Sequence, residues 1–201
     1  MSCDPRYRFD LTNRFVIDAT PQEMTRIVLD PDVFAKWAPR VIVKMQLLDR
    51  GGPDGTGIEN RIHASGWLPY GIVFTVRIAQ VVPDRSMHMT LRGDFHGDAY
   101  LSIRPLPDAS GCEETIRAVF EMRHRYLRPL VPTLRPLFVW NHRWAVRWLH
   151  RAMQREVYRR RHLADGFPDQ RPTFPHNLPW FRNRWPKRAA ADDALPNASD
   201  R

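Results

Sequence analysis

Hydrophobic and polar residues alternate along most of the first 125 residues. Between residues 112 and 125, for example, Ile116, Ala118 and Phe120 share one face, while Arg117 and Glu121 share the other. A period of two is typical of antiparallel strands that bury one face and expose the other. Turn residues separate most of the alternating segments. The pattern predicts about seven strands, over residues 6–19, 41–47, 58–65, 70–82, 86–93, 94–104 and 112–125.

Helical patterns occur at two places. Thr20, Pro21 and Glu23 have the spacing of an N-cap, a first-turn proline and an N3 acid, so a short helix is expected there. Asp30 and Pro31 interrupt it, and a second short helix carrying Trp37 is expected before Pro39. The segment 138–161 contains neither glycine nor proline, which predicts one long helix. Three prolines in the preceding segment, 127–137, predict a bent connection instead of helix.

This order of elements predicts an α+β helix-grip fold over residues 1–162. A curved antiparallel sheet of about seven strands wraps around the long C-terminal helix, and the two short helices follow the first strand. Residues 163–201 are rich in proline and arginine, and we expect an extended tail without a core of its own. A single helix held by a curved sheet encloses a cavity, so the predicted partner is an apolar small molecule.

The net charge of +9 comes from one part of the chain. Residues 121–162 hold 11 Lys/Arg and 2 Asp/Glu, whereas residues 1–120 hold 14 and 15. The N-terminus lacks the apolar stretch of a signal peptide, and no apolar run approaches the ~20 residues of a spanning helix. We therefore expect a soluble, cytoplasmic protein, with peripheral attachment to a membrane left open. The two cysteines, Cys3 and Cys112, form neither a disulfide framework nor a zinc site.

Several of these segments resemble a known family. They are the first strand, the helix pair at 20–37, the corner Gly66-Trp67-Leu68-Pro69-Tyr70 and the segment 93–97. Together they resemble the polyketide cyclase/dehydrase branch of the START-like (SRPBCC, birch-pollen-allergen-like) superfamily. The segment 135–144, RPLFVWNHRW, resembles the entry to the C-terminal helix in bacterial members. The resemblance covers about residues 6–162. It implies the helix-grip fold, but this superfamily includes enzymes, lipid carriers and receptors, so the fold does not decide the function.

Aromatic and inward-facing residues are the candidates for ligand binding. Trp140, Trp144 and Trp148 recur every four residues and form one stripe, which either packs on the sheet or roofs the cavity. Two polar residues, Asn60 and Asn141, occupy positions where burial requires a partner. The predicted ligand-binding residues are Trp37, Asn60, Trp67, Phe74, Met89, Phe120, Met122, Trp140, Asn141, Trp144 and Trp148.

An enzyme of the polyketide aromatase/cyclase or dehydratase type is the alternative. His124 or His142 would move protons, and Asn60 or Asn141 would hold an enolate. A histidine at a strand end is equally compatible with a structural role at the rim. Two histidines and an aspartate, His88, His96 and Asp98, share the wet face of adjacent strands, and no metal-binding motif is present. The sequence therefore predicts neither a metal nor a cofactor.

A second stripe on the long helix is basic. Its arginines recur every four residues and form either a solvated outer face or a surface for an anionic partner. An anionic membrane is the favoured partner and an acidic carrier protein is possible. Nucleic acid is disfavoured, because the fold offers no element that reads a groove. The residues are Arg143, Arg147, Arg151, Arg155 and Arg159.

Overall fold

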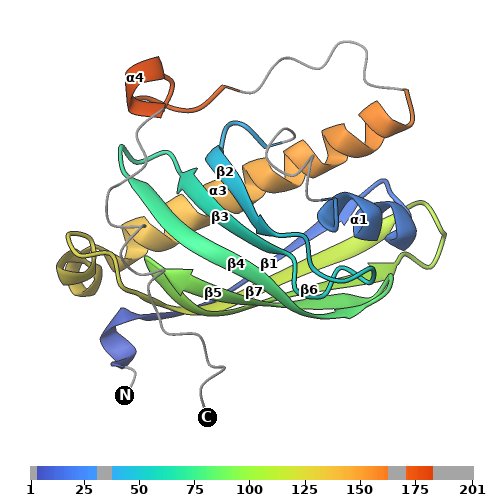
Figure 1. The fold of residues 1–201 in the computed structure, drawn as a ribbon, viewed down its shortest axis with the longest axis horizontal. Coiled ribbons are helices and arrows are strands. Elements are labelled where there is room, and N and C mark those ends of the chain that lie inside the picture. Colours follow the sequence, from blue (N-terminus) through green and yellow to red (C-terminus); the bar gives the residue numbers. More distant parts are fainter. Residues whose placement is uncertain (1–3, 31–37, 163–170, 183–201) are drawn as a thin grey trace.

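The computed structural model describes residues 4–30, 38–162 and 171–182. Its main element is a seven-stranded antiparallel sheet in the order β1-β7-β6-β5-β4-β3-β2 (Figure 1). From β2 to β7, each strand pairs with its neighbour in sequence. The first strand, β1, pairs with β7 instead of with β2. The strands are β1 (Arg8–Ile17), β2 (Ile42–Asp49), β3 (Glu59–Ser65), β4 (Gly71–Val82), β5 (Ser86–Gly93), β6 (Phe95–Pro105) and β7 (Cys112–Met122).

The long helix α3 (Val131–Arg160) lies along one face of the curved sheet, which confirms the predicted helix-grip fold (Figure 1). The short helix α1 (Pro21–Val28) follows β1 and packs near the C-terminal end of α3. Its start has the expected capping box: Thr20 Oγ1 accepts from the Glu23 N–H, and Glu23 accepts from the Thr20 N–H at 2.8 Å. One short helix follows β1 in the described part of the chain. The second predicted helix, and with it Trp37, lies outside the described residues.

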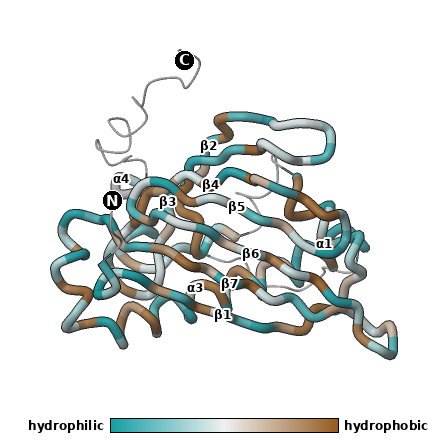
Figure 2. Tube along the Cα trace, turned by 90° about the horizontal axis from the view of Figure 1, so that it is seen from below, coloured by the Kyte–Doolittle hydropathy of each residue, from teal (hydrophilic) through white to brown (hydrophobic). Residues whose placement is uncertain are grey.

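The alternating pattern places the core between the sheet and α3. Hydrophilic and hydrophobic positions alternate along several strands (Figure 2). In β7, for example, Ala118 and Phe120 are buried, while Arg117 is exposed and pairs with Asp10 of β1 at 2.7 Å. One buried cluster surrounds α1 and the C-terminal half of α3. The other lies beside the start of α3 and includes Phe9, Phe120, Met122, Val131 and Phe138.

The start of α3 differs from the prediction. The expected bent connection is instead a 3-10 turn, η2 (Arg128–Leu130), followed at once by helix. Pro132 lies in the first turn, where a backbone N–H has no intrahelical partner to lose. Pro136 lies inside the helix, and the backbone leaves helical geometry at Leu134, with φ −104° and ψ 18°. The prolines therefore kink the helix without delaying its start.

Arginines at the C-terminal end of α3 bind acidic side chains. Arg161 makes a bidentate contact with Glu23 at 2.7 and 2.6 Å and also reaches Asp18 at 3.1 Å. Arg160 contacts both Asp30, at 2.7 Å, and the buried Glu156. The Arg161 guanidinium lowers the pKa of Glu23 to about 2, from an ordinary value of 4.5. The ion pairs with Asp18, Glu23 and Asp30 attach the helix end to the β1–α1 region.

Part of the predicted tail packs on the domain. The Thr173 hydroxyl donates to the Gly66 carbonyl at 2.7 Å, and His176 is completely buried with its ring edge-on to His63. A short helix, α4 (Pro179–Arg182), follows. The division into units at residue 162 stays a prediction. Among the described residues, no helix is both long and apolar enough to cross a membrane.

Replacing Arg161 by Gln should lower the free energy of unfolding at pH 7 by about 1 kcal/mol, because both partners are partly exposed and the pair is partly screened. The folded-state pKa of Glu23 is depressed, so the contribution of the pair is present above pH 4.5 and disappears as the pH falls toward 2. Urea unfolding at several pH values should therefore show a difference from wild type that shrinks on acidification.

Arg143→Gln is the matched control, because Arg143 is exposed on the same helix and forms no ion pair with a described residue. Equal stability of Arg161→Gln and Arg143→Gln at pH 7 would contradict the role given to these ion pairs.

Candidate ligand-binding site

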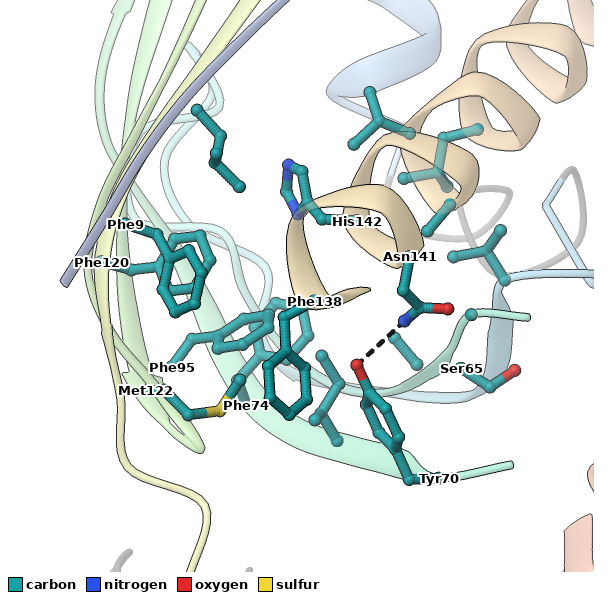
Figure 3. Close-up of a pocket in the computed structure, with 18 residues that line it drawn as sticks. Phe9, Ser65, Tyr70, Phe74, Phe95, Phe120, Met122, Phe138, Asn141 and His142 are labelled. Carbon is teal, nitrogen blue, oxygen red and sulfur yellow. Dashed lines mark hydrogen bonds between the residues drawn. The ribbon is translucent and has the colours of Figure 1, made fainter. Parts of the chain in front are cut away.

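A cavity of about 140 Å³ lies between the sheet and the N-terminal half of α3 (Figure 3). Aliphatic and aromatic side chains form most of its wall, and none of the lining residues in the described part of the chain is Asp, Glu, Lys or Arg. The lining residues are Phe9, Leu11, Val41, Ala64, Ser65, Gly66, Tyr70, Ile72, Phe74, Phe95, Phe120, Met122, Phe138, Asn141, His142, Ala145, Val146 and Leu149.

Phenylalanine rings make up one side of this wall. Phe120 stacks on Phe9 with ring centroids 5.3 Å apart and lies 4.3 Å from Phe95, which in turn contacts Phe74. Phe138 of α3 faces this group from the helix (Figure 3). Cavities with such walls stay dry and accept apolar rings. The wall is therefore suited to an apolar guest.

Asn141 connects α3 to the corner between β3 and β4. Its Oδ1 accepts from two backbone N–H groups, those of Trp67 at 2.8 Å and Leu68 at 3.0 Å. Its Nδ2 donates to the Tyr70 hydroxyl oxygen at 2.9 Å (Figure 3). The side chain is buried, so these bonds satisfy an amide that would be costly to bury alone. Asn141 therefore holds the Gly66–Tyr70 corner, which carries part of the cavity wall.

Gly66 is required for this connection. A Cβ atom at that position would overlap the Asn141 side-chain amide, lying 2.6 Å from its Cγ. The corner and the helix thus approach each other as closely as they do because residue 66 has no side chain.

The remaining polar groups in the wall are uncharged. Burial raises the pKa of the Tyr70 phenol to about 12, so it keeps its proton at neutral pH. Burial, with a contribution from Arg143, lowers the pKa of His142 to about 4, so its ring is neutral. His142 Nε2 and Ser65 Oγ are buried and have no hydrogen-bond partner among the described residues. The polar groups of the cavity wall are therefore neutral, and two of them have a buried polar atom without a hydrogen-bond partner among the described residues.

The structure brings some of the predicted residues to this cavity and not others. Phe74, Phe120, Met122, Asn141 and His142 line it. Met89 packs against both core clusters without reaching the cavity.

Two of the predicted polar residues lie elsewhere. Asn60 has a buried side-chain oxygen without a partner among the described residues, but it is outside the cavity wall. His124 Nδ1 accepts from the Tyr126 and Leu127 N–H groups, both at 3.3 Å, and so stabilises the turn after β7.

The tryptophan stripe does not form the roof of the cavity. Trp140 is 45% exposed and meets Trp67, which is 55% exposed, edge to face at 5.3 Å. Trp144 and Trp148 are half-buried beneath the Arg40 guanidinium, which lies 3.9 Å from the Trp148 ring. The roof comes instead from the apolar stripe of Phe138, Ala145 and Leu149. Both stripes have helical spacing, and only the packed structure shows which one faces the sheet.

Sequence reasoning also missed Tyr70, although it had singled out the corner that contains it. A tyrosine beside Pro69 at a strand start was a usable signal for a polar group at the cavity edge. Its hydrogen bond with Asn141, 71 positions away in the sequence, cannot be predicted from residue spacing.

The basic stripe divides into two parts. Arg143, Arg147 and Arg151 are exposed, and Arg151 lies over the Trp148 ring at 4.9 Å. Arg155 is half-buried, and Arg159 pairs with Glu156 at 2.6 Å. The first three are thus the arginines that remain available to an anionic surface.

The described residues contain no group of three or more His, Cys, Asp or Glu side chains with metal-binding geometry. His88 and Asp98 of the outer sheet face form a pair at 2.7 Å, and the His88 ring stacks on Tyr100.

A family model described as polyketide cyclase/dehydrase and lipid transport matches residues 8–163. A comparison with curated protein sequences finds no match.

Solved structures show the same fold at low sequence identity. The Zhui aromatase/cyclase from Streptomyces sp. R1128 is 17% identical with a TM-score of 0.62, covering 80% of this chain and 99% of its own. A START superfamily protein from Mycobacterium smegmatis is 19% identical with a TM-score of 0.56, over 75% and 97%. The protein TTHA0849 from Thermus thermophilus is 15% identical with a TM-score of 0.57, over 72% and 97%.

Gly66→Ala should destabilise the protein by about 1–3 kcal/mol, because the new methyl group displaces the Asn141 amide from two backbone donors. Thermal unfolding measures the loss, and hydrogen exchange should show faster exchange of the Trp67 and Leu68 amides. In the control Gly52→Ala, the added Cβ would lie 3.1 Å from the flexible Asp54 side chain. Unchanged protection of the two amides in Gly66→Ala would show that Asn141 does not hold the corner.

Proposed function

Because the chain belongs to the polyketide cyclase/dehydrase and lipid-transport family, we propose that it binds an apolar small molecule in the cavity between sheet and α3. The observation that carries this proposal is the chemistry of the cavity wall: aromatic and aliphatic side chains, few polar atoms and no ionised group. Such a wall favours a guest through burial of apolar surface. The role is that of a binding or carrier protein for a polyketide, isoprenoid or lipid-like molecule.

The size of the cavity restricts what it encloses. At about 140 Å³ it is close to the ~150 Å³ of an engineered cavity that binds benzene. It is below the ~300–1,000 Å³ typical of sites for drug-sized ligands. We therefore propose that one ring, or the end of one chain, enters the cavity, and that any larger part of the ligand stays outside.

The aromatase/cyclase alternative has less support. It needs polar residues that converge on the cavity, and two of its four candidates, His124 and Asn60, lie away from it. Asn141 does line the wall, but both lone pairs of its amide oxygen are occupied by backbone donors. His142 also lines the wall, and its buried Nε2 has no hydrogen-bond partner among the described residues.

Filling the cavity should strongly weaken the binding of an uncharged apolar ring. Ligand-observed NMR with α-methylstyrene should show saturable binding to the wild type and at least roughly tenfold weaker binding to Ala145→Phe, because the added ring occupies the guest's volume. Ala64→Leu fills the same space from β3 and should act in the same direction.

Ala79→Phe is the matched control, since Ala79 is exposed on β4. Equal binding by wild type, Ala145→Phe and Ala64→Leu would contradict the proposed site, as would absence of saturable binding to wild type.

We propose a second function, docking on an anionic membrane, because of one specific observation. The half-exposed pair Trp67 and Trp140 lies next to the exposed Arg143 and Arg147 on the outer side of α3. Aromatic rings beside arginines are the combination that favours the interface of an anionic bilayer. Gly66, the neighbour of Trp67, lines the cavity. Docking through this pair would therefore bring the cavity close to the membrane.

The double variant Arg143→Glu/Arg147→Glu should lose most of its sedimentation with vesicles of phosphatidylcholine and phosphatidylglycerol, since each basic residue near such a surface contributes about 1 kcal/mol. Adding Trp140→Ser to this double variant should reduce the sedimentation with vesicles further. The effect of the tryptophan should persist at high salt, where the electrostatic part of the binding is screened. The control Arg92→Glu/Arg104→Glu changes the net charge equally at exposed positions on β5 and β6. The same loss in both double variants would mean that net charge, and not this surface, is responsible.

A further inference from the structure

The hydrogen bonds of Asn141 determine what the Tyr70 hydroxyl can do. Two backbone N–H groups point at Asn141 Oδ1, so the amide cannot be rotated without facing donors with donors. The group that faces Tyr70 is therefore the NH₂, and it donates to the hydroxyl oxygen at 2.9 Å. Tyr70 is the acceptor in this bond, so its own proton is not used in it.

The contacts of the described residues supply no acceptor for that proton. Beyond this bond, the Tyr70 side chain makes an edge-on ring contact with Phe138, with ring centroids 5.9 Å apart, which uses no polar atom. A donor in an apolar wall gains free energy when it meets an acceptor. The hydroxyl thus offers one fixed donor at the edge of an otherwise apolar cavity.

The charge of the wall limits the acceptor that can meet this donor. None of the described residues that line the cavity has a cationic side chain, and both the Tyr70 phenol and the His142 ring are neutral at pH 7. An isolated carboxylate or phosphate would lose its hydration there without gaining a counter-ion, which is costly. A neutral oxygen, such as that of a ketone, quinone or ester, carries a much smaller penalty.

We infer that the cavity selects a neutral, ring-bearing ligand with a carbonyl-type oxygen, and that Tyr70 is the donor that recognises this oxygen. This inference rests on the function proposed above. The phenylalanine side of the wall receives the ring, and Asn141 acts as a positioning residue that fixes the orientation of the donor.

A pair of probes with nearly the same shape tests the inference. Acetophenone and α-methylstyrene both carry one ring, and differ in having a carbonyl oxygen or a methylene group at the same place. Titration followed by ligand-observed NMR should give about fivefold tighter binding of the ketone to the wild type, the difference expected for one neutral hydrogen bond. In Tyr70→Phe this preference should disappear, while the affinity for α-methylstyrene stays within about twofold.

The alkene also reports whether the variant keeps its cavity, so a general loss of structure is recognised. Tyr126→Phe is the matched control, because Tyr126 is 70% exposed and outside the cavity wall. It should keep the full preference for the ketone. Equal binding of the two probes to the wild type, or a ketone preference that survives in Tyr70→Phe, would overturn the role of Tyr70 and leave the apolar cavity proposal standing. If neither probe binds the wild type, both proposals fail.

Discussion

The amide of Asn141 is the contact on which the arrangement of the site depends. It satisfies two backbone donors of the Gly66–Tyr70 corner and places the Tyr70 hydroxyl, and it does so from the helix that covers the sheet. Without it, the helix and the corner would approach each other through apolar contacts alone, which are non-directional. A buried amide that makes three directional hydrogen bonds instead fixes one relative position. The cavity is the space left beside that fixed point.

The two ends of α3 have different chemistry. At its C-terminal end, Arg160 and Arg161 meet acids of the β1–α1 region, and the core there includes Met24, Ile27 and Val157. Near its N-terminal end, aromatic side chains surround the cavity and the neighbouring surface exposes Trp67 and Trp140. Ion pairs therefore hold the helix at its C-terminal end, where charged side chains line a second, polar pocket of about 210 Å³. The apolar cavity lies toward the other end.

The alternation of residue types was sufficient to predict the fold. The expected strands at 70–82 and 86–93 match β4 and β5 to within one residue, because polar-out and apolar-in patterning applies directly to a sheet with one wet face. The sequence predicts the helix start too late, because the prolines of segment 127–137 favour a bent connection. In the structure Pro132 is harmless in the first turn, and Pro136 only kinks the helix. The site was predicted in part. Asn141 and His142 were found because a polar residue on a helix facing a core is unusual. The rotation of α3, and the bond from Asn141 to Tyr70, depend on packing between distant segments.

Ligand binding between the sheet and α3 requires a dry, accessible cavity beside Asn141. A crystal structure determined under xenon pressure tests it directly, since xenon enters apolar cavities of this size. We expect xenon density among Phe9, Phe120 and Phe138, with the Asn141 hydrogen bonds unchanged. Side chains that fill this space, or a chain of ordered water in it without xenon, would contradict the account.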